Sequence, residues 1–357
     1  MKIALIGNTD FSIYNYRFEL CLELLSKKNE VFIICPEGNF VNRMVSCGCK
    51  HLCIKVNAHG MNPFQDFALV RKLKKILKKE KPDYVCGFTI KPNIYGAYVC
   101  KKMGIPFIAN ITGLGSNVEK KGCFQRLVVF MYRIAFSKIQ RVFCQNVSIR
   151  SFFEEHNIAK DKLKLISGSG VNLQKFSATP YPRTGKIAFG FVSRVKKEKG
   201  IDLFIDAARY FRNQISNVEF HVYGVCDNDY MWIKDEPAII YHGVSNDTAK
   251  VFQKLNCLVF PSYYAEGLAN VLLEASASGR PVITTDRAGC REAVENRISG
   301  YLIPEKDLTS LIQAIESFLA LTIDEQEQMG ICGRIKVEKE FDRTQIINYY
   351  LDEMGIC

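Results

Sequence analysis

The stretch Phe260-Pro-Ser-Tyr-Tyr-Ala-Glu-Gly-Leu-Ala-Asn-Val-Leu-Leu-Glu-Ala275 decides how the chain is interpreted. It begins where an apolar run, Cys257 to Phe260, predicts a buried strand, and we expect Gly267 to open a helix. Glu266 would then precede a helix N-terminus, where free N–H groups and the helix dipole favour an anion. Glu274 follows about 12 Å further along the helix axis.

The spacing of Glu266 and Glu274 allows two interpretations. It matches roughly the reach from the sugar to the ribose of a nucleotide sugar, so that each carboxylate would accept hydrogen bonds from one ring and the diphosphate would lie between them at the helix tip. Alternatively, Glu266 complements the helix dipole and Glu274 is solvated. The pair alone does not decide between them.

A second element, Gly190-Phe-Val-Ser-Arg-Val-Lys-Lys-Glu-Lys-Gly200, follows the same plan. A predicted strand at 187–192 leads to Arg194 and Lys199, and Gly200 starts a helix. Two cations beside a helix start suit a diphosphate and require no metal ion. A solvated lysine-rich loop is the alternative.

A third element, Thr284-Thr-Asp-Arg-Ala-Gly-Cys-Arg-Glu-Ala293, also comes directly after a predicted strand. Gly289 allows a backbone to approach a ligand closely, and Glu292 stands at the next helix start. An ordinary strand-to-helix turn would look the same.

Apolar runs alternate with helical patterns along the whole chain, which predicts an α/β fold with parallel sheets. The predicted strands are 2–7, 31–35, 83–88, 106–111, 141–145, 187–192, 218–224, 238–242, 257–261 and 281–284. The clearest predicted helices are 70–81, 124–138, 200–213, 246–255, 267–279, 308–321 and Arg343 to Met354.

The length of 357 residues suits two domains, and the segment 177–185, with two prolines and a glycine, is the predicted linker. We therefore expect an N-terminal domain at 1–178 and a C-terminal domain at 186–338. The final segment, 339–357, has an apolar helical face that can return to the first domain. Ligands of such sheets bind at the carboxyl ends of the strands, so two doubly wound domains would hold the chemistry in a cleft between them.

Fourteen cysteines without a secretion signal indicate a reducing cytosol. Cys47, Cys49, His51 and Cys53 alternate along a predicted strand, which would place all four on one face about 6.8 Å apart. That spacing is too wide for a tetrahedral zinc site, so we predict a buried strand face and no metal.

Taken together, the three elements resemble glycosyltransferase family 4, which has the GT-B fold of two facing Rossmann-like domains. The resemblance spans essentially the whole chain. It implies that Arg194 and Lys199 clamp the diphosphate, that Glu266 holds the transferred sugar and that Glu274 holds the ribose. Other implied donor-binding positions are Gly267, Leu268, Ala269, Gly289, Glu292 and Gly7 of the first loop.

The N-terminal half resembles a narrower branch, the transferases that build O-antigen, capsule and related glycans on undecaprenyl diphosphate. The residues that carry this resemblance are Phe88-Thr-Ile-Lys-Pro-Asn-Ile-Tyr-Gly96, Asn110-Ile-Thr-Gly-Leu-Gly-Ser116, residues 59–63 and Asn15-Tyr-Arg17. The acceptor-side candidates are Lys91, Asn93, Thr112, Gly113, Asn15 and Arg17. Many relatives carry a glycine pair in the first loop and a histidine near the sugar, which this chain lacks.

Charge is divided unevenly between the halves. Residues 1–178 hold 28 Lys and Arg against 12 Asp and Glu, whereas the whole chain carries a net +11. An anionic partner of the first half is therefore expected. The apolar segment 124–138, with basic residues beside it, suits an interfacial helix on anionic lipid, although a core helix with a solvated basic face is possible. Signatures of nucleic-acid binding are missing.

The resemblance implies a retaining transfer of a hexose or N-acetylhexosamine from a nucleotide sugar, UDP before GDP, to a lipid-linked saccharide. No metal cofactor is expected, and the location would be cytoplasmic, at the inner face of the cell membrane. A sugar-nucleotide epimerase of the same fold and a non-enzymatic nucleotide-sugar-binding protein are the alternatives. A dehydrogenase is disfavoured because the first loop lacks Gly-x-Gly-x-x-Gly.

Overall fold

The computed structural model describes residues 1–56 and 62–356. Contacts divide the chain into two compact units. The first unit comprises Met1–Ser169 together with Thr344–Cys357, and the second comprises Gly170–Arg343. Residues 59–61, part of the segment 59–63 that resembles the narrower branch, lie outside the described residues.

The first unit is built on a parallel sheet with the strand order β3-β2-β1-β4-β5-β6-β7. Its strands are β1 (Lys2–Ile6), β2 (Glu30–Cys35), β3 (Lys50–Cys53), β4 (Tyr84–Phe88), β5 (Phe107–Ile111), β6 (Arg141–Cys144) and β7 (Leu163–Leu165). The five strands predicted for this half agree with the structure to within a residue or two at each end. The edge strand β7 has three partly exposed residues and too little apolar signal to be predicted.

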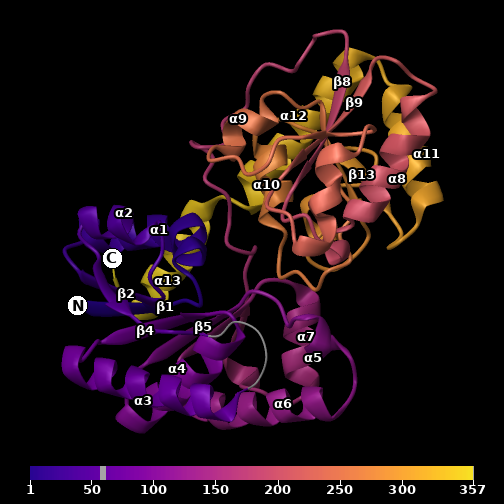
Figure 1. The fold of residues 1–357 in the computed structure, drawn as a ribbon. Coiled ribbons are helices and arrows are strands. Elements are labelled where there is room, and N and C mark those ends of the chain that lie inside the picture. The colour runs from indigo at the N-terminus through magenta and orange to yellow at the C-terminus, as the bar shows by residue number, and fades with distance from the viewer. Residues whose placement is uncertain (57–61, 357) are drawn as a thin grey trace. The chain divides into compact units, whose positions relative to one another are not determined.

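Helices cover both faces of this sheet, as Figure 1 shows. Alternate strand residues face opposite sides, so Ala4 and Ile6 pack in one core cluster and Ile3 and Leu5 in another. The first cluster is covered by α3 (Pro63–Glu80), α4 (Ile90–Met103), α6 (Cys123–Ala135) and α7 (Val147–Glu155). The second is covered by α1 (Asp10–Ser26), α2 (Val41–Ser46) and α13 (Arg343–Met354). A short helix, α5 (Ser116–Glu119), precedes α6.

Helix α3 begins earlier than the predicted segment 70–81. The side chain of Asn62 accepts hydrogen bonds from the N–H groups of Phe64 and Gln65, and Pro63 occupies the first helical position. Both features favour a helix start. The apolar period alone misses this first part because Phe64 and Phe67 are exposed.

The prediction for Cys47, Cys49, His51 and Cys53 is wrong. Strand β3 begins only at Lys50, and Cys47 follows the end of α2. Cys49 is buried, whereas Cys47 and Cys53 are exposed, so the four residues do not share a buried face.

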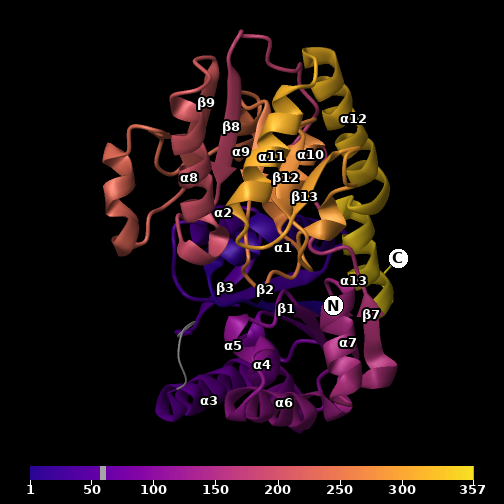
Figure 2. The ribbon, with the colours of Figure 1, turned by 90° about the vertical axis from the view of Figure 1, so that its right-hand side faces the viewer.

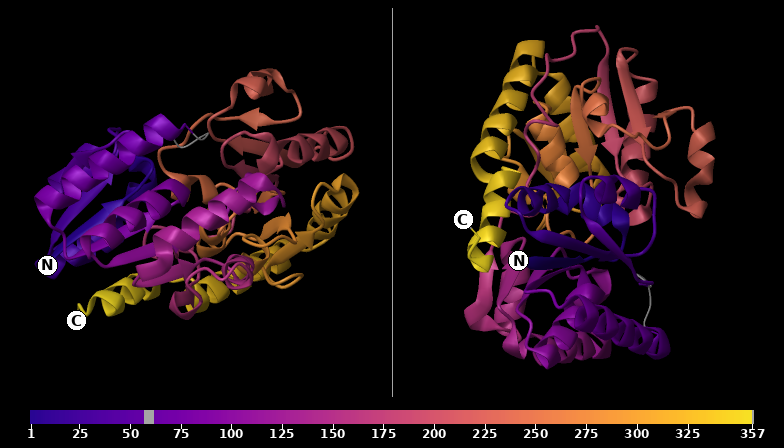
Figure 3. Two further views of the ribbon diagram at one scale, coloured as in Figure 1. Left: turned by 90° about the horizontal axis from the view of Figure 1, so that it is seen from below. Right: turned by 90° about the vertical axis from the view of Figure 1, so that its left-hand side faces the viewer.

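Helix α13 belongs to the first unit although it ends the chain (Figure 3). Tyr350 packs against the rings of Phe88 and Phe143, and its hydroxyl accepts a hydrogen bond from the amide of Asn110 at 2.7 Å. Arg141 and Glu353 form an ion pair at 2.7 Å. The last helix thus completes one face of the first sheet.

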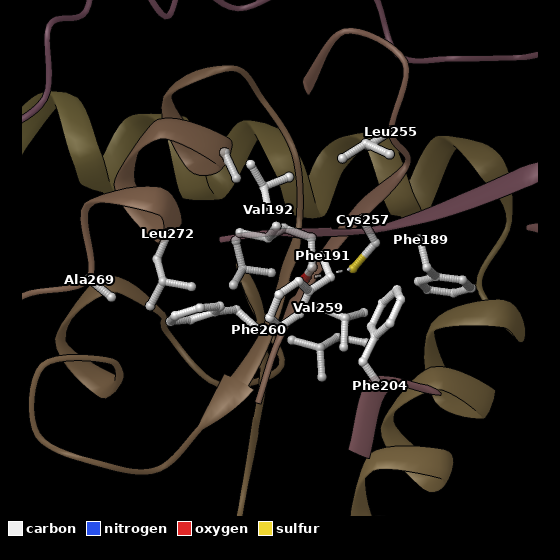
Figure 4. Close-up of a cluster of buried hydrophobic side chains, with 14 of the residues drawn as sticks. Phe189, Phe191, Val192, Phe204, Leu255, Cys257, Val259, Phe260, Ala269 and Leu272 are labelled. Atoms are coloured by element: carbon white, nitrogen blue, oxygen red, sulfur yellow. Dashed lines mark hydrogen bonds between the residues drawn. The ribbon is translucent and has the colours of Figure 1, made fainter. Parts of the chain in front are cut away.

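The second unit has a parallel sheet with the order β10-β9-β8-β11-β12-β13. Its strands are β8 (Ile187–Val192), β9 (Val218–Tyr223), β10 (Ile240–Tyr241), β11 (Cys257–Phe260), β12 (Val282–Thr285) and β13 (Gly300–Ile303). Figure 2 shows the helices around them: α8 (Ile201–Arg212), α9 (Thr248–Phe252), α10 (Asn270–Ala277), α11 (Leu308–Leu319) and α12 (Ile323–Glu340). Aromatic side chains such as Phe191, Phe204 and Phe260 fill the core (Figure 4).

The boundary between the units lies at Ser169 and Gly170, ahead of the predicted linker at 177–185. The proline-rich segment packs on the second unit instead of spanning freely. Tyr181 is buried and donates to the carbonyl of Asn256 at 2.9 Å, and the guanidinium of Arg280 donates to the hydroxyl of Thr179 at 2.7 Å.

Candidate functional site

The loops after β8, β11 and β12 meet at one edge of the second sheet because these strands are parallel neighbours. There the ammonium of Lys199 and the carboxylate of Glu266 form an ion pair. Their side chains are only 10% and 15% exposed. Lys199 ends a short 3₁₀ turn, Lys197–Lys199, and Glu266 lies in the loop after β11. The structure therefore joins two of the three predicted catalytic residues.

Two side chains that the sequence did not single out adjoin this pair. The ammonium of Lys199 lies 4.6 Å from the centre of the Tyr264 ring, a cation–π distance. Cys290 is fully buried, and burial together with the charge of Glu266 raises the pKa of its thiol to about 12. Tyr264 could have been noticed as an aromatic residue in the loop directly after a strand, whereas nothing in the sequence pointed to Cys290.

Two glycines allow these loops to approach each other. A Cβ on Gly200 would lie 2.1 Å from the carbonyl oxygen of Pro261, and one on Gly289 would lie 2.7 Å from the carbonyl oxygen of Glu266. Both glycines have positive φ, +82° and +88°. The Gly289 loop is closed by Glu292, whose carboxylate accepts a hydrogen bond from the N–H of Gly289 at 2.7 Å. Glu292 therefore shapes this loop.

The predicted helix start at Gly267 is wrong, because α10 begins at Asn270. Leu268 and Ala269 are buried in the core, and the N–H of Ala269 donates to the carbonyl of Gly289 at 2.8 Å. This hydrogen bond between distant loops holds residues 266–269 in an irregular conformation. Glu266 consequently lies four residues ahead of the first helical residue.

Glu274 occupies the second turn of α10 and is half-buried. Burial raises the pKa of its carboxyl from the usual 4.5 to about 7, although the positive charges of Lys175 and Arg343 act in the opposite direction. Both cations come from segments far away in sequence at the ends of the second unit. Glu274 is therefore a carboxyl group that titrates near neutral pH.

Arg194 and Asn270 each carry a polar group without a hydrogen-bond or ion-pair partner among the described residues. The exposed side chain of Arg194 makes no hydrogen bond or ion pair with any described residue. The buried Oδ1 of Asn270, the first residue of α10, also has no hydrogen-bond partner among the described residues. The predicted clamp thus contains one engaged cation, Lys199, and one available cation, Arg194.

In the first unit, the loops after β1, β4 and β5 share one sheet edge. Gly7 follows β1, and its N–H donates to the carbonyl of Ile34 at 3.1 Å. Lys91, in the first turn of α4, pairs with Asp66 of α3 at 2.8 Å. Asn93 is fully buried and donates to the carbonyl of Asn110 at 2.8 Å, which ties α4 to β5.

The remaining acceptor-side candidates lie at the same sheet edge or on α1. Thr112 and Gly113 follow β5 and are half-buried. On α1, the amide of Asn15 donates to the carbonyl of Phe11 at 3.1 Å. Arg17 is buried with its guanidinium 4.6 Å from the centre of the Phe88 ring.

Thr89, between β4 and α4, is a residue that the sequence did not single out. Its φ of +71° and ψ of 168° lie in a region that residues other than glycine rarely adopt. Its buried Oγ1 has no hydrogen-bond partner among the described residues. Thr89 is thus a strained residue whose buried hydroxyl has no partner among the described residues, and it lies directly after β4 and two residues ahead of Lys91.

In residues 1–56 and 62–356, no group of three or more His, Cys, Asp and Glu side chains is arranged to hold a metal ion. Within the same residues, no helix combines the length and the apolar character needed to cross a membrane.

Comparison with known proteins decides the family. The family described as "Glycosyl transferase 4-like" matches residues 2–146, and "Glycosyl transferases group 1" matches residues 186–320. The chain belongs to glycosyltransferase family 4. It is a glycosyltransferase with the GT-B fold, as the three loop elements predicted.

Several relatives align with this family 4 glycosyltransferase over more than nine tenths of their length. The N,N'-diacetylbacillosaminyl-diphospho-undecaprenol α-1,3-N-acetylgalactosaminyltransferase of Campylobacter jejuni is 25% identical, over 98% of this chain and 97% of its own. The capsular polysaccharide biosynthesis glycosyltransferase CapM of Staphylococcus aureus is 27% identical, over 93% and 91%. The HepE protein of Anabaena, crystallised with UDP and glucose, shares the fold with a TM-score of 0.82 at 15% identity, over 99% of both chains.

Proposed function

We propose that this glycosyltransferase moves a hexose or N-acetylhexosamine from a nucleotide sugar, with UDP preferred, to a saccharide on undecaprenyl diphosphate during synthesis of a bacterial surface polysaccharide. The observation that carries the proposal is the Lys199–Glu266 pair at the carboxyl edge of the second sheet. Support for the acceptor comes from the relatives, two of which are named for a diphospho-undecaprenol substrate. Support for UDP comes from the neighbours crystallised with UDP or UDP-glucose.

In the proposed donor complex, the second unit binds the nucleotide sugar. Arg194, Lys199 and the first N–H groups of α10 hold the diphosphate. Glu266 accepts hydrogen bonds from the sugar, and Glu274 accepts them from the ribose. The backbone at Gly267, Leu268, Ala269 and Gly289 lines the path between the two glutamates. This arrangement neutralises the diphosphate without a metal ion.

The Lys199–Glu266 pair gives this site a defined electrostatic role. The two charges compensate each other in a partly buried setting. An entering diphosphate competes for the ammonium, and an entering sugar offers hydroxyl donors to the carboxylate. Both groups are therefore held ready at the point where the leaving group and the sugar meet.

The proposed reaction retains the anomeric configuration. The acceptor hydroxyl attacks the anomeric carbon from the face that the diphosphate leaves, the bond from this carbon to the diphosphate oxygen breaks, and the departing diphosphate takes up the hydroxyl proton. Arg194, Lys199 and the start of α10 stabilise the negative charge that develops on the leaving group. The protein otherwise contributes by positioning the hydroxyl.

The acceptor is assigned to the first unit, with Lys91, Asn93, Thr112, Gly113, Asn15 and Arg17 as candidates. We place the enzyme in the cytoplasm at the inner face of the membrane. Support comes from α3 and α6, which carry exposed Phe64, Phe67 and Phe130 close in sequence to many basic residues. Aromatic and basic side chains together favour the surface of anionic lipid.

A panel of nucleotide sugars, incubated with a saccharide on undecaprenyl diphosphate and analysed by mass spectrometry, tests the proposal. One donor should extend the acceptor by a single sugar. Conversion of the donor alone into its epimer, or binding without any product from any donor, would contradict it. Family membership already favours transfer over these two alternatives.

A further inference from the structure

An open apolar pocket of about 330 Å³ lies among three helices of the first unit. Pro63, Phe67 and Val70 contribute one face of α3, Leu127 and Met131 contribute one face of α6, and Tyr95 of α4 lies between them. Phe67 is 63% exposed and Leu127 is 43% exposed. Such exposed apolar surface on a helical layer indicates a binding region.

Among the described residues that line the pocket, Asp66 is the one with a charged side chain, and this charge is compensated within the protein. Its carboxylate pairs with Lys91 at 2.8 Å, and the hydroxyl of Tyr95 hydrogen-bonds to it. Burial, together with this carboxylate, raises the pKa of Tyr95. The pocket therefore presents an apolar wall with a compensated polar cluster. This cluster also shows where the pocket lies in the first unit, because Lys91 is in the first turn of α4, shortly after the end of β4.

The pocket thus adjoins the edge of the sheet where the acceptor-side candidates lie. From the Lys91 end, at the start of α4, the apolar lining follows the first two turns of α3 and α4. We propose that it binds the isoprenoid segment next to the diphosphate of the lipid-linked acceptor. This inference rests on the proposed function and adds that the enzyme recognises the lipid itself.

Size and charge favour this occupant over others. A pocket at the lower end of the usual 300–1,000 Å³ range takes a short apolar segment and not a whole polyprenyl chain. A second copy of the chain would bring the same lysine-rich surface, since α3 carries Arg71, Lys72, Lys74 and Lys75, and like charges repel. A lipid diphosphate unites the apolar segment and the negative charge in one molecule.

Short, water-soluble acceptors separate lipid recognition from membrane docking. The test compares one saccharide carried by a methyl diphosphate, a linear ten-carbon alkyl diphosphate and a ten-carbon isoprenoid diphosphate. Each buried methylene contributes about fourfold in affinity, so kcat/KM for the isoprenoid should exceed that for the methyl ester by about tenfold or more. Equal values for all three acceptors would overturn the inference while leaving the transfer itself established.

Variants locate the effect. Leu127→Trp fills the pocket and Phe67→Ser removes a wall, so both should reduce the isoprenoid preference to near unity with unchanged kcat/KM for the methyl ester. Phe130→Ser, an exposed change on α6 outside the lining, is the control and should keep the preference. A preference that survives in both pocket variants would contradict the assignment.

A readout independent of activity covers the case in which no acceptor is extended, an outcome that would count against the proposed function. A photoactivatable isoprenoid diphosphate should label peptides of α3 and α6 at Phe67 or Met131, as found by mass spectrometry, with competition by the unlabelled isoprenoid diphosphate and not by inorganic diphosphate. Labelling elsewhere, or none, would overturn the pocket assignment.

Discussion

The ammonium of Lys199 and the carboxylate of Glu266, 67 residues apart in sequence, are in direct contact, and this ammonium lies 4.6 Å from the centre of the Tyr264 ring. The pair is only slightly exposed, so neither charge is well solvated without the other. Replacement of either residue by an uncharged one therefore leaves the charge of its partner uncompensated.

Lys199→Ala should lower kcat by about 100-fold or more, since it removes a charge that stabilises the leaving diphosphate. Initial rates with saturating donor measure this effect. Lys197→Ala, an exposed change in the same 3₁₀ turn, is the matched control and should leave kcat nearly unaltered. Near-normal turnover in Lys199→Ala would refute the clamp assignment.

Glu274 should make donor affinity depend on pH. Hydrogen bonds from ribose favour the carboxylate, and with a pKa of about 7 in the free protein its charged fraction rises about tenfold from pH 6 to pH 8. The Kd for UDP should therefore fall by up to about tenfold over this range in calorimetric titrations. Glu274→Gln should bind more weakly at pH 8 and lose the pH dependence attributed to this carboxyl. An unchanged slope in the variant would count against the ribose contact.

The same residue should affect stability. Folding raises the pKa of Glu274, so between about pH 4.5 and pH 7 the folded chain binds more protons than the unfolded chain. The contribution of Glu274 to stability is therefore full below pH 4.5 and is lost as pH rises through 7. Glu274→Gln should melt above the wild type at pH 8 without ligand, and the difference should shrink towards pH 5. A lower Tm of the variant at pH 8 would contradict the direction of the shift.

Gly289→Ala should impair both stability and donor binding, because the new Cβ would lie 2.7 Å from the carbonyl oxygen of Glu266. Gly185→Ala isolates the backbone cost, since Gly185 has a similar φ of +80° with no atom within 4 Å of the added Cβ. We expect about 1 kcal/mol from the φ angle alone and a larger loss at Gly289. Equal destabilisation by the two changes in denaturant titrations would show that the loops do not need this close approach.

Thr89→Gly should stabilise the first unit by about 1 kcal/mol, because it relieves a backbone conformation suited to glycine and removes a buried unpartnered hydroxyl. Thr89→Ala separates these contributions, since it removes the hydroxyl and keeps the strained backbone. Chemical denaturation of the three proteins gives the comparison. If Thr89→Gly is less stable than the wild type, the strain assigned to this residue is absent.

Membrane docking should depend on α3 and α6. In flotation with vesicles, the protein should float with anionic lipid, and binding should weaken as salt is raised. Phe64→Ser together with Phe130→Ser should reduce flotation several-fold, whereas Tyr210→Ser, an exposed aromatic change in the second unit, should not. Absence of binding to anionic and neutral vesicles alike would rule out docking through this surface.

Most strands and the fold class followed from the sequence because buried parallel strands leave short apolar runs with clear ends. Where the structure departs from the prediction, a tertiary contact decides. The start of α10 moves to Asn270 because Ala269 donates to the carbonyl of Gly289, a partner twenty residues away that no local pattern shows. Likewise, the pKa of Glu274 near 7 depends on its burial, which raises the pKa, and on the charges of Lys175 and Arg343, which lower it.

In the candidate site, too, local sequence patterns predict some features and tertiary contacts decide the others. Lys199 and Glu266 could be predicted because each follows a strand in a parallel sheet. Their direct contact could not, since it depends on Gly200 and Gly289 allowing two loops to touch. Lys91 became a candidate because its segment resembles the narrower branch, and only the structure reveals that Asp66 pairs with it.

The hydrogen bond between Asn110 and Tyr350 joins residues that are 240 positions apart. While the chain is being synthesised, the face of the first sheet that α13 covers stays bare, with Ile346, Tyr350 and Leu351 still to come. The first unit therefore reaches its final form only after residues 346–351 have been made, and a stop codon ahead of Ile346 damages the part of the chain that was made first as well as the part that it removes.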